Sequence, residues 1–351
     1  MSAVAEGLRV AFRVDASTEI GSGHVMRCLT LADTLAEAGA RCWFLMREQT
    51  GSLEGLVERR GHKALPVSTE AFETLDLVPG DTLDWLVVDH YALDYRWEQL
   101  NSACARRVMV IDDLADRRHY CNVLLDQTFG RFPRSYSGLV PQETTLLCGA
   151  EYSLLRPEFA RLRRQSLEHR NPRRLRNLLI SMGGADRDNF TRRALETLER
   201  ESLGAGKFIT VVLGPSSPWV RDVRKLAERT ELEVKVLVGI SNMAEVMAKQ
   251  DFVIGAAGSS IWERCCLGLP SAMVVVADNQ IFAANELRES GACRVLEGGA
   301  RFETSLASVI EDLDANPEQL GIMSKAAAAI TDGLGASRVA AVMRGFGSDN
   351  D

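Results

Sequence analysis

Short runs rich in Val, Ile and Leu alternate with helix-periodic segments along almost all of this 351-residue chain. Strands this apolar are buried on both faces, and the helices that connect them make neighbouring strands parallel. The pattern therefore predicts an α/β protein with parallel sheets covered by helices on both sides. We expect strands at residues 8–14, 41–47, 62–66, 85–89, 107–111, 123–126, 145–148, 177–181, 208–213, 233–238, 251–254 and 272–276.

A basic run in the middle of the chain divides this alternation into two halves. It spans residues 161–176, contains Pro172, and is interpreted as a solvated surface helix followed by an interdomain linker. The length also suits two domains, each with a full core. We expect two Rossmann-like, doubly wound lobes at residues 8–165 and 173–346. Ligands of such sheets bind beyond the carboxyl ends of the strands, so the cleft between the lobes is the expected site.

Composition excludes several classes of partner. The net charge of −7 argues against nucleic acid as the main ligand, because that binding relies on Lys and Arg. The eight cysteines are scattered, which fits a reducing cytoplasm, and the five histidines lack the spacing of zinc ligands. No apolar run approaches the ~20 residues that span a bilayer. We expect a cytoplasmic monomer without cofactor, metal site, membrane or nucleic-acid partner.

A glycine-rich turn places a histidine at the start of the first helix. Gly21 and Gly23 let the backbone approach a ligand closely, and the N-terminus of a helix favours an anion. His24 follows them, and the ordinary histidine pKa of about 6.5 suits a general base at neutral pH. This combination indicates chemistry on a phosphate ester. The alternative is that His24 only caps its helix.

Two further strand ends in the first half carry polar residues. Tyr91 follows the strand 85–89 and is able to hydrogen-bond a ligand, or else it packs as an aromatic at the strand end. Asp112 and Asp113 end the strand 107–111. Neighbouring residues point in different directions, so a paired-acid mechanism is not supported, and one of the two is expected to cap the following turn.

Loops in the second half offer bare backbone and hydroxyls. Gly183 and Gly184 follow a strand and admit a phosphate or base against the main chain. After the strand 251–254, Ser259 and Ser260 supply hydroxyls at the start of a helix, where free amides suit a diphosphate. Glu263 is placed to accept two hydrogen bonds from a ribose, or else forms a capping box with Ser260.

The strand 272–276 ends in Asn279 and Gln280, whose amides suit sugar hydroxyl or acetamido groups, unless they only begin a helix. No G-x-G-x-x-G or G-x-x-x-x-G-K-[ST] motif occurs in these loops. Nicotinamide dehydrogenase and P-loop ATPase functions are therefore disfavoured.

Several of these motifs, in this order, closely resemble the UDP-2,4-diacetamido-2,4,6-trideoxy-β-L-altropyranose hydrolase family of pseudaminic acid synthesis. That family is similar in turn to UDP-sugar glycosyltransferases with two facing Rossmann-like lobes, the GT-B type. The resemblance covers nearly the whole chain. It rests on the runs Arg13-Val-Asp-Ala-Ser17, Ile20-Gly-Ser-Gly-His-Val-Met-Arg-Cys-Leu-Thr-Leu-Ala-Asp33, Val88-Asp-His-Tyr91, Ile111-Asp-Asp-Leu114, Trp262-Glu-Arg-Cys-Cys-Leu-Gly-Leu-Pro270 and Ala277-Asp-Asn-Gln280.

The resemblance implies roles for individual residues in a metal-independent reaction. His24 matches the catalytic base and Tyr91 the tyrosine that assists at the substrate, both in the first lobe. UDP is held mainly by the second lobe. The substrate-binding residues expected there are Gly183, Met243 near the uracil, Ser259 and Ser260 at the phosphates, Glu263 at the ribose, and Asn279 and Gln280 at the sugar or diphosphate. Arg13, Asp15, Gly21 and Gly23, within the matching motifs, complete the expected set.

The function implied is hydrolysis of the UDP-diacetamido sugar to UDP and the free sugar, with inversion at C1. Water deprotonated by His24 would attack the anomeric carbon. One alternative is a GT-B glycosyltransferase, which would need an acceptor; another is a noncatalytic module that binds a nucleotide sugar. Release of UDP into water without an acceptor distinguishes the three.

Overall fold

The computed structural model describes residues 7–16, 22–48, 52–67, 83–170, 174–184 and 186–346. The chain divides into two compact units. The first unit is Met1–Arg156 together with Leu334–Asp351, and the second unit is Pro157–Gly333.

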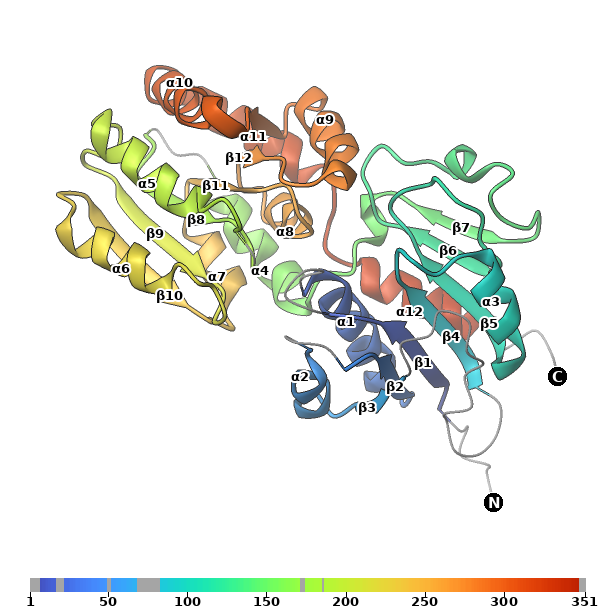
Figure 1. Cartoon of the computed structure of the whole chain (residues 1–351). Coiled ribbons are helices and arrows are strands. Elements are labelled where there is room, and N and C mark those ends of the chain that lie inside the picture. Colours follow the sequence, from blue (N-terminus) through green and yellow to red (C-terminus); the bar gives the residue numbers. More distant parts are fainter. Residues whose placement is uncertain are drawn as a thin grey trace. The chain divides into compact units, whose positions relative to one another are not determined.

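Parallel strands form the sheet of the first unit (Figure 1). The sheet order within the described residues is β3 (Lys63–Pro66), β2 (Arg41–Met46), β1 (Arg9–Val14), β4 (Leu83–Asp89), β5 (Ala105–Ile111), β6 (Val123–Asp126) and β7 (Thr145–Cys148). The order reverses at β1, which pairs with β2 on one side and β4 on the other. The segments that follow β1 and β4 therefore lie at a topological switch point, where doubly wound sheets bind ligands.

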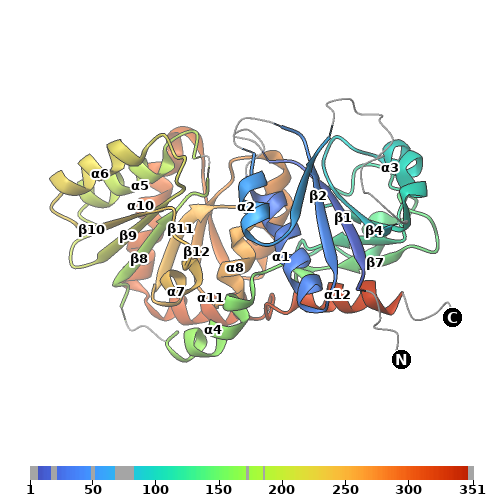
Figure 2. The same ribbon diagram turned by 90° about the horizontal axis from the view of Figure 1, so that it is seen from below.

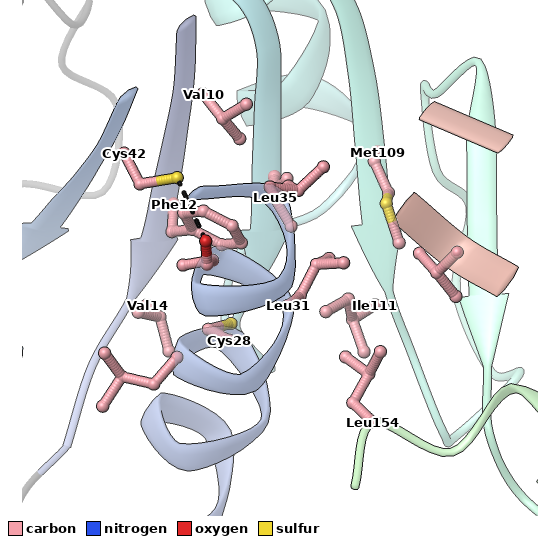
Figure 3. Packing of buried hydrophobic residues seen from close by; sticks show 14 of the residues in the cluster. Val10, Phe12, Val14, Cys28, Leu31, Leu35, Cys42, Met109, Ile111 and Leu154 are labelled. Atoms are coloured by element: carbon pink, nitrogen blue, oxygen red, sulfur yellow. Dashed lines mark hydrogen bonds between the residues drawn. The ribbon is translucent and has the colours of Figure 1, made fainter. Parts of the chain in front are cut away.

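Helix α1 (Gly23–Glu37) covers one face of this sheet because its apolar residues recur at helical spacing. Figure 3 shows Phe12 and Val14 of β1 against Cys28, Leu31 and Leu35 of α1, all of them fully buried. Full burial of a side chain such as Leu or Phe stabilises the fold by about 1.5–3 kcal/mol. The remaining helical segments before residue 157 are α2 (Glu54–Arg59), α3 (Tyr95–Asn101) and the 3-10 turns Ser102–Cys104, Pro133–Tyr136 and Ala150–Tyr152.

The last helix of the chain, α12 (Gly335–Gly345), belongs to the first unit. It packs beside α1 (Figure 2), and the indole N–H of Trp85 in β4 donates to the Met343 carbonyl at 3.2 Å. The division expected at residues 8–165 and 173–346 is therefore corrected at both boundaries. Residues after 333 return to the first unit, while α4 (Pro157–Glu168) already belongs to the second.

The second unit repeats the same plan with another parallel sheet. Its order in the described residues is β10 (Glu233–Val238), β9 (Phe208–Leu213), β8 (Asn177–Ser181), β11 (Phe252–Ala256), β12 (Ser271–Val274) and β13 (Cys293–Leu296). Its switch point lies between β8 and β11. The accompanying helices are α5 (Phe190–Arg200), α6 (Val220–Arg229), α7 (Met243–Ala248), α8 (Ser260–Cys266), α9 (Ile281–Glu289), α10 (Phe302–Ala315), α11 (Glu318–Ala328) and the 3-10 turns Asp278–Gln280 and Gly299–Arg301.

The predicted fold class is confirmed, since both sheets are parallel and doubly wound. Five strands have the predicted bounds, and the other seven differ by one or two residues at one or both ends. Strand β13 was not predicted, because its sequence Cys-Arg-Val-Leu is short and carries a charged residue. In the described part of the chain, no helix combines the length and apolarity needed to cross a membrane.

The basic run is not simply a solvated face. Arg163 in α4 donates to the carbonyls of Cys266, Ala328 and Thr331, and these bonds hold α4 against the ends of α8 and α11. Arg170 similarly donates to the carbonyls of Gln250, Met247 and Leu267. These two arginines are structural anchors of the second unit, because the last carbonyls of a helix need donors from elsewhere.

Candidate active site

His24 lies at the switch point of the first sheet, on the first turn of α1. The N-cap position is Ser22, so the interpretation of His24 as a helix cap is wrong. Its ring Nδ1 instead lies 2.6 Å from Oδ1 of Asp89, and the imidazole side chain is 13% exposed. Asp89 ends β4 and stands in register with Val14 at the end of β1. The parallel pairing of the two strands therefore brings the carboxylate beside the histidine.

Asp89 is a buried acceptor of several donors. Nε and Nη2 of Arg27 donate to its two oxygens at 2.7 and 2.6 Å, and the Cys28 thiol donates at 3.5 Å. Burial alone would raise the pKa of Asp89, but the charge of Arg27 and the hydrogen bonds from Arg27 and His24 hold it well below its ordinary value. The carboxylate is therefore ionised and accepts from His24.

This arrangement fixes the tautomer of the histidine. Because ionised Asp89 has no proton to donate, Nδ1 of His24 carries the ring proton. Nη2 of Arg27 also approaches Nδ1 to 3.1 Å, but both groups are donors and both are directed to Asp89. In the neutral ring, Nε2 is then the nitrogen that accepts a proton. A base oriented by a carboxylate is the arrangement used to activate hydroxyl groups and water.

Tyr91 and Asp113 extend this cluster. The phenol of Tyr91 donates to Asp113 at 3.0 Å, and Nη1 of Arg27 donates to the same carboxylate at 3.1 Å. The rings of Tyr91 and His24 meet edge to face with centroids 4.8 Å apart. Tyr91 is 39% exposed and therefore keeps a surface available to a ligand. Asp113 acts in this cluster, whereas Asp112 is buried and caps the turn at the N–H groups of Leu114 and Ala115.

Arg13 and Asp15 form a separate, buried ion pair beside this cluster. The Arg13 guanidinium donates to both oxygens of Asp15, which also accepts from the backbone and side chain of Arg47. Nε2 of His90 lies 3.0 Å from the same carboxylate. Burial works against ionisation, yet His90 and Arg13 hold the pKa of Asp15 well below its ordinary value. The cluster ties together the segments after β1, β2 and β4, and a substrate-binding role for Arg13 and Asp15 stays a prediction.

The two glycines predicted to contact the substrate belong to the turn before α1. Gly21 lies outside the described residues, and Gly23 is the first residue of α1.

The expected nucleotide-binding residues follow three adjacent strands of the second sheet. Gly183 comes after β8 with a φ of +80°, a conformation that favours glycine, and a Cβ there would meet no described atom within 4 Å. Ser259 and Ser260 follow β11, and a Cβ on Gly258 before them would likewise meet no described atom within 4 Å. The structure thus brings the loops after β8 and β11 to one switch point.

The other predicted residues follow β12 and β10 or lie within α8. Asn279 and Gln280 follow β12, and Oε1 of Gln280 accepts from the N–H of Val276. Met243 begins α7 after β10, at the far edge of the sheet. The capping-box interpretation of Glu263 is wrong, because Ser259 rather than Ser260 is the N-cap of α8 and makes no side-chain cap bond. The contact of Glu263 with a ribose stays a prediction.

Three members of the first-unit cluster were missed as site residues: Arg27, Asp89 and Asp113. Arg27 lies on α1 one turn after His24, whereas only the pairing of β4 with β1 and β5 reveals that Asp89 meets His24 and that Asp113 meets Arg27 and Tyr91. Within the described residues, no group of three or more His, Cys, Asp and Glu side chains is placed to hold a metal ion.

Several known proteins resemble this chain in sequence or in fold. Residues 178–339 match the glycosyltransferase family 28 C-terminal domain. The chain is 25% identical, over 81% of its own length and 97% of the relative, to the UDP-2,4-diacetamido-2,4,6-trideoxy-β-L-altropyranose hydrolase of Campylobacter jejuni. It is 23% identical, over 96% of its length and 98% of the relative, to the spore coat polysaccharide biosynthesis protein SpsG of Bacillus subtilis.

Among solved structures, the crystal structure of Acinetobacter baumannii MurG matches with a TM-score of 0.67 and 16% identity, over 96% of this chain and 99% of that one. This likeness concerns the fold. Together with the two parallel sheets, it identifies the architecture as a GT-B fold. The expected resemblance to the hydrolase family is also confirmed.

Proposed function

We propose that this protein hydrolyses UDP-2,4-diacetamido-2,4,6-trideoxy-β-L-altropyranose to UDP and the free sugar, with inversion at C1. The coarser assignment, an enzyme related to UDP-sugar enzymes, rests on the family match and on the similarity to the Campylobacter jejuni hydrolase. The finer assignment rests on one observation. Asp89, held by Arg27, fixes His24 as a base whose Nε2 accepts a proton.

In the proposed reaction, Nε2 of His24 takes a proton from a water molecule while the water oxygen bonds to C1 of the sugar. The bond between C1 and the diphosphate oxygen breaks, and its electron pair leaves with UDP. Attack from the face opposite UDP gives the inverted anomer. Asp89 stabilises the imidazolium that forms. Tyr91, whose hydroxyl donates to Asp113, is proposed to contact the sugar.

The second unit is proposed to hold the nucleotide. Ser259 and Ser260 supply hydroxyl donors to the diphosphate, and Gly183 and Gly258 leave room for close approach of its oxygens. Each preorganised donor at a developing negative charge lowers the barrier by about 3 kcal/mol.

The test is to incubate the purified protein with the UDP-sugar alone and to measure UDP. The proposal predicts stoichiometric release of UDP and free sugar in the absence of any acceptor. Release that requires an added acceptor would instead support a GT-B glycosyltransferase, the second candidate, which the match of residues 178–339 to glycosyltransferase family 28 favours. Binding without release of UDP under either condition would overturn both.

A further inference from the structure

Arg264 is a fully buried guanidinium in α8 of the second unit, only 2% exposed. Nη2 donates to the carbonyl of Ala256 at 2.8 Å and Nε to the carbonyl of Ser260 at 3.3 Å. These two carbonyls bracket the β11–α8 loop, residues 257–259. Nη1 has no hydrogen-bond partner among the described residues.

The chain makes room for this side chain next to the switch point. A Cβ on Gly255 would lie 2.9 Å from Nη1 of Arg264 and 2.7 Å from the carbonyl oxygen of Ser181 at the end of β8. Both distances are shorter than real Cβ contacts allow. Gly255 is therefore required by the close approach of the guanidinium and of β8, and the guanidinium lies beside the ends of the two strands that form the switch point.

The charge of Arg264 is compensated only weakly in the described structure, where the neighbouring Glu263 acts on it without forming an ion pair. Both of its bonds go to neutral carbonyls, and no ion pair of Arg264 with a carboxylate occurs among the described residues. Burial lowers its pKa, but an arginine guanidinium stays protonated in proteins. A buried charge without an ion-paired carboxylate is costly, and an apolar side chain would avoid that cost. The location of the charge therefore indicates an anion that comes to the loop in front of it.

We propose that Arg264 is a positioning residue for the ligand diphosphate. Arg264 holds the β11–α8 loop by donating to the carbonyls of Ala256 and Ser260 on either side of the loop. Its positive charge attracts the diphosphate without direct contact with the ligand. This inference rests on the proposed function, because it takes the loop as the diphosphate site. In a poorly solvated interior, a unit charge acts over several ångströms with little screening.

The experiment compares UDP with uridine, which lacks the diphosphate, by calorimetric titration of the full-length protein. Arg264→Gln keeps a donor for the carbonyls but removes the charge. We expect this variant to bind UDP about tenfold more weakly or worse, while its uridine affinity stays within about twofold of wild type. Arg288→Gln, an equal charge change at an exposed position of α9, is the matched control and should alter neither affinity.

A second variant keeps the test decisive if Arg264→Gln does not fold. Arg264→Lys retains the charge, so its ratio of UDP to uridine affinity should stay within about threefold of wild type. An equal loss of UDP and uridine affinity in either variant, or no loss in Arg264→Gln, would overturn the inference and leave Arg264 a structural residue. If the wild type binds neither ligand, the proposed function itself fails.

Discussion

At the residue scale, the proposed chemistry depends on His24. Replacement of His24 by Ala removes the proton acceptor but leaves the proposed nucleotide-binding loops of the second unit intact. We expect kcat for UDP release to fall by about 10²–10⁴-fold, with the Kd of the UDP-sugar within about threefold of wild type. His169→Ala is the matched control, because His169 is exposed and, within the described residues, its Nδ1 hydrogen-bonds to the backbone carbonyl of Gln165 in α4, the helix that it follows. Near-normal turnover of His24→Ala would exclude the assignment.

Asp89 provides a second prediction at this scale. Asp89→Asn offers an amide that is able to donate to His24, which favours the other tautomer and points an N–H instead of a lone pair at water. We expect kcat to fall by about 10²–10⁴-fold. Arg27 also loses its buried counter-charge, although Asp113 remains, so the free energy of unfolding should fall by about 3 kcal/mol. Steady-state kinetics and urea unfolding measure the two effects. Unchanged kcat in the folded variant would contradict the tautomer argument.

The candidate site was only partly predictable from single residues. His24 and Tyr91 stand out in the sequence because motifs surround them, and the structure brings them together. Their partner Asp89 ends β4 and their partner Asp113 lies two residues after β5, 24 positions further on, and both look like ordinary turn residues. Only the pairing of β4 with β1 and β5 makes them one cluster, and pairing is a tertiary property.

At the scale of elements, most strands were predictable because strands that lie between two layers of helices are rich in apolar residues. Strand β13 was missed because it has only four residues and one of them is Arg294. Helix α4 was predicted as a helix but not as an anchored one. The spacing of apolar residues does not predict which arginines donate to the carbonyls at the ends of neighbouring helices. The roles of Arg163 and Arg170 are therefore visible only in the structure.

The anchoring of α4 leads to a stability prediction. Arg163→Met should lower the free energy of unfolding by about 2–4 kcal/mol, because three carbonyls lose a charged donor. The neighbouring Arg164→Met is the control. Arg164 is 92% exposed, and its pair with Glu168 is a surface pair, so its loss should change stability by less than about 0.5 kcal/mol. Urea unfolding measures both variants, and equal effects would contradict the anchoring role.

At the scale of the whole molecule, a buried network in the first unit makes stability depend on pH. The Tyr136 hydroxyl lies 2.8 Å from Asp112 and 2.9 Å from Asp126, but it has a single proton to donate. His119 and Arg117 favour the ionised form of Asp112, which therefore accepts the Tyr136 proton. Asp126 is then the carboxyl that is protonated and donates to the phenol oxygen. Consistently, burial raises the pKa of Asp126 from 3.8 to about 6.

A raised pKa in the folded protein means that the folded state keeps a proton that the unfolded state loses. This contribution to stability is fully present below pH 3.8 and is lost as pH rises to about 6. Two pKa units correspond to about 3 kcal/mol. Asp126→Asn mimics the protonated acid and should remove the loss. Urea unfolding of both proteins from pH 4 to 7 should show wild type losing about 2 kcal/mol relative to the variant, the larger part of the full contribution. If the free energies of unfolding of wild type and Asp126→Asn change with pH in parallel, Asp126 is not the group that holds the proton.

The measurement that most directly tests water attack at the anomeric carbon is real-time ¹H NMR of the wild-type protein with the UDP-diacetamido sugar and no acceptor. We predict that UDP and free sugar appear together and that the first anomer formed is the inverted one, before mutarotation mixes the two. A first product with retained configuration, or a substrate that stays intact until an acceptor is added, would contradict hydrolysis by a water molecule activated at His24.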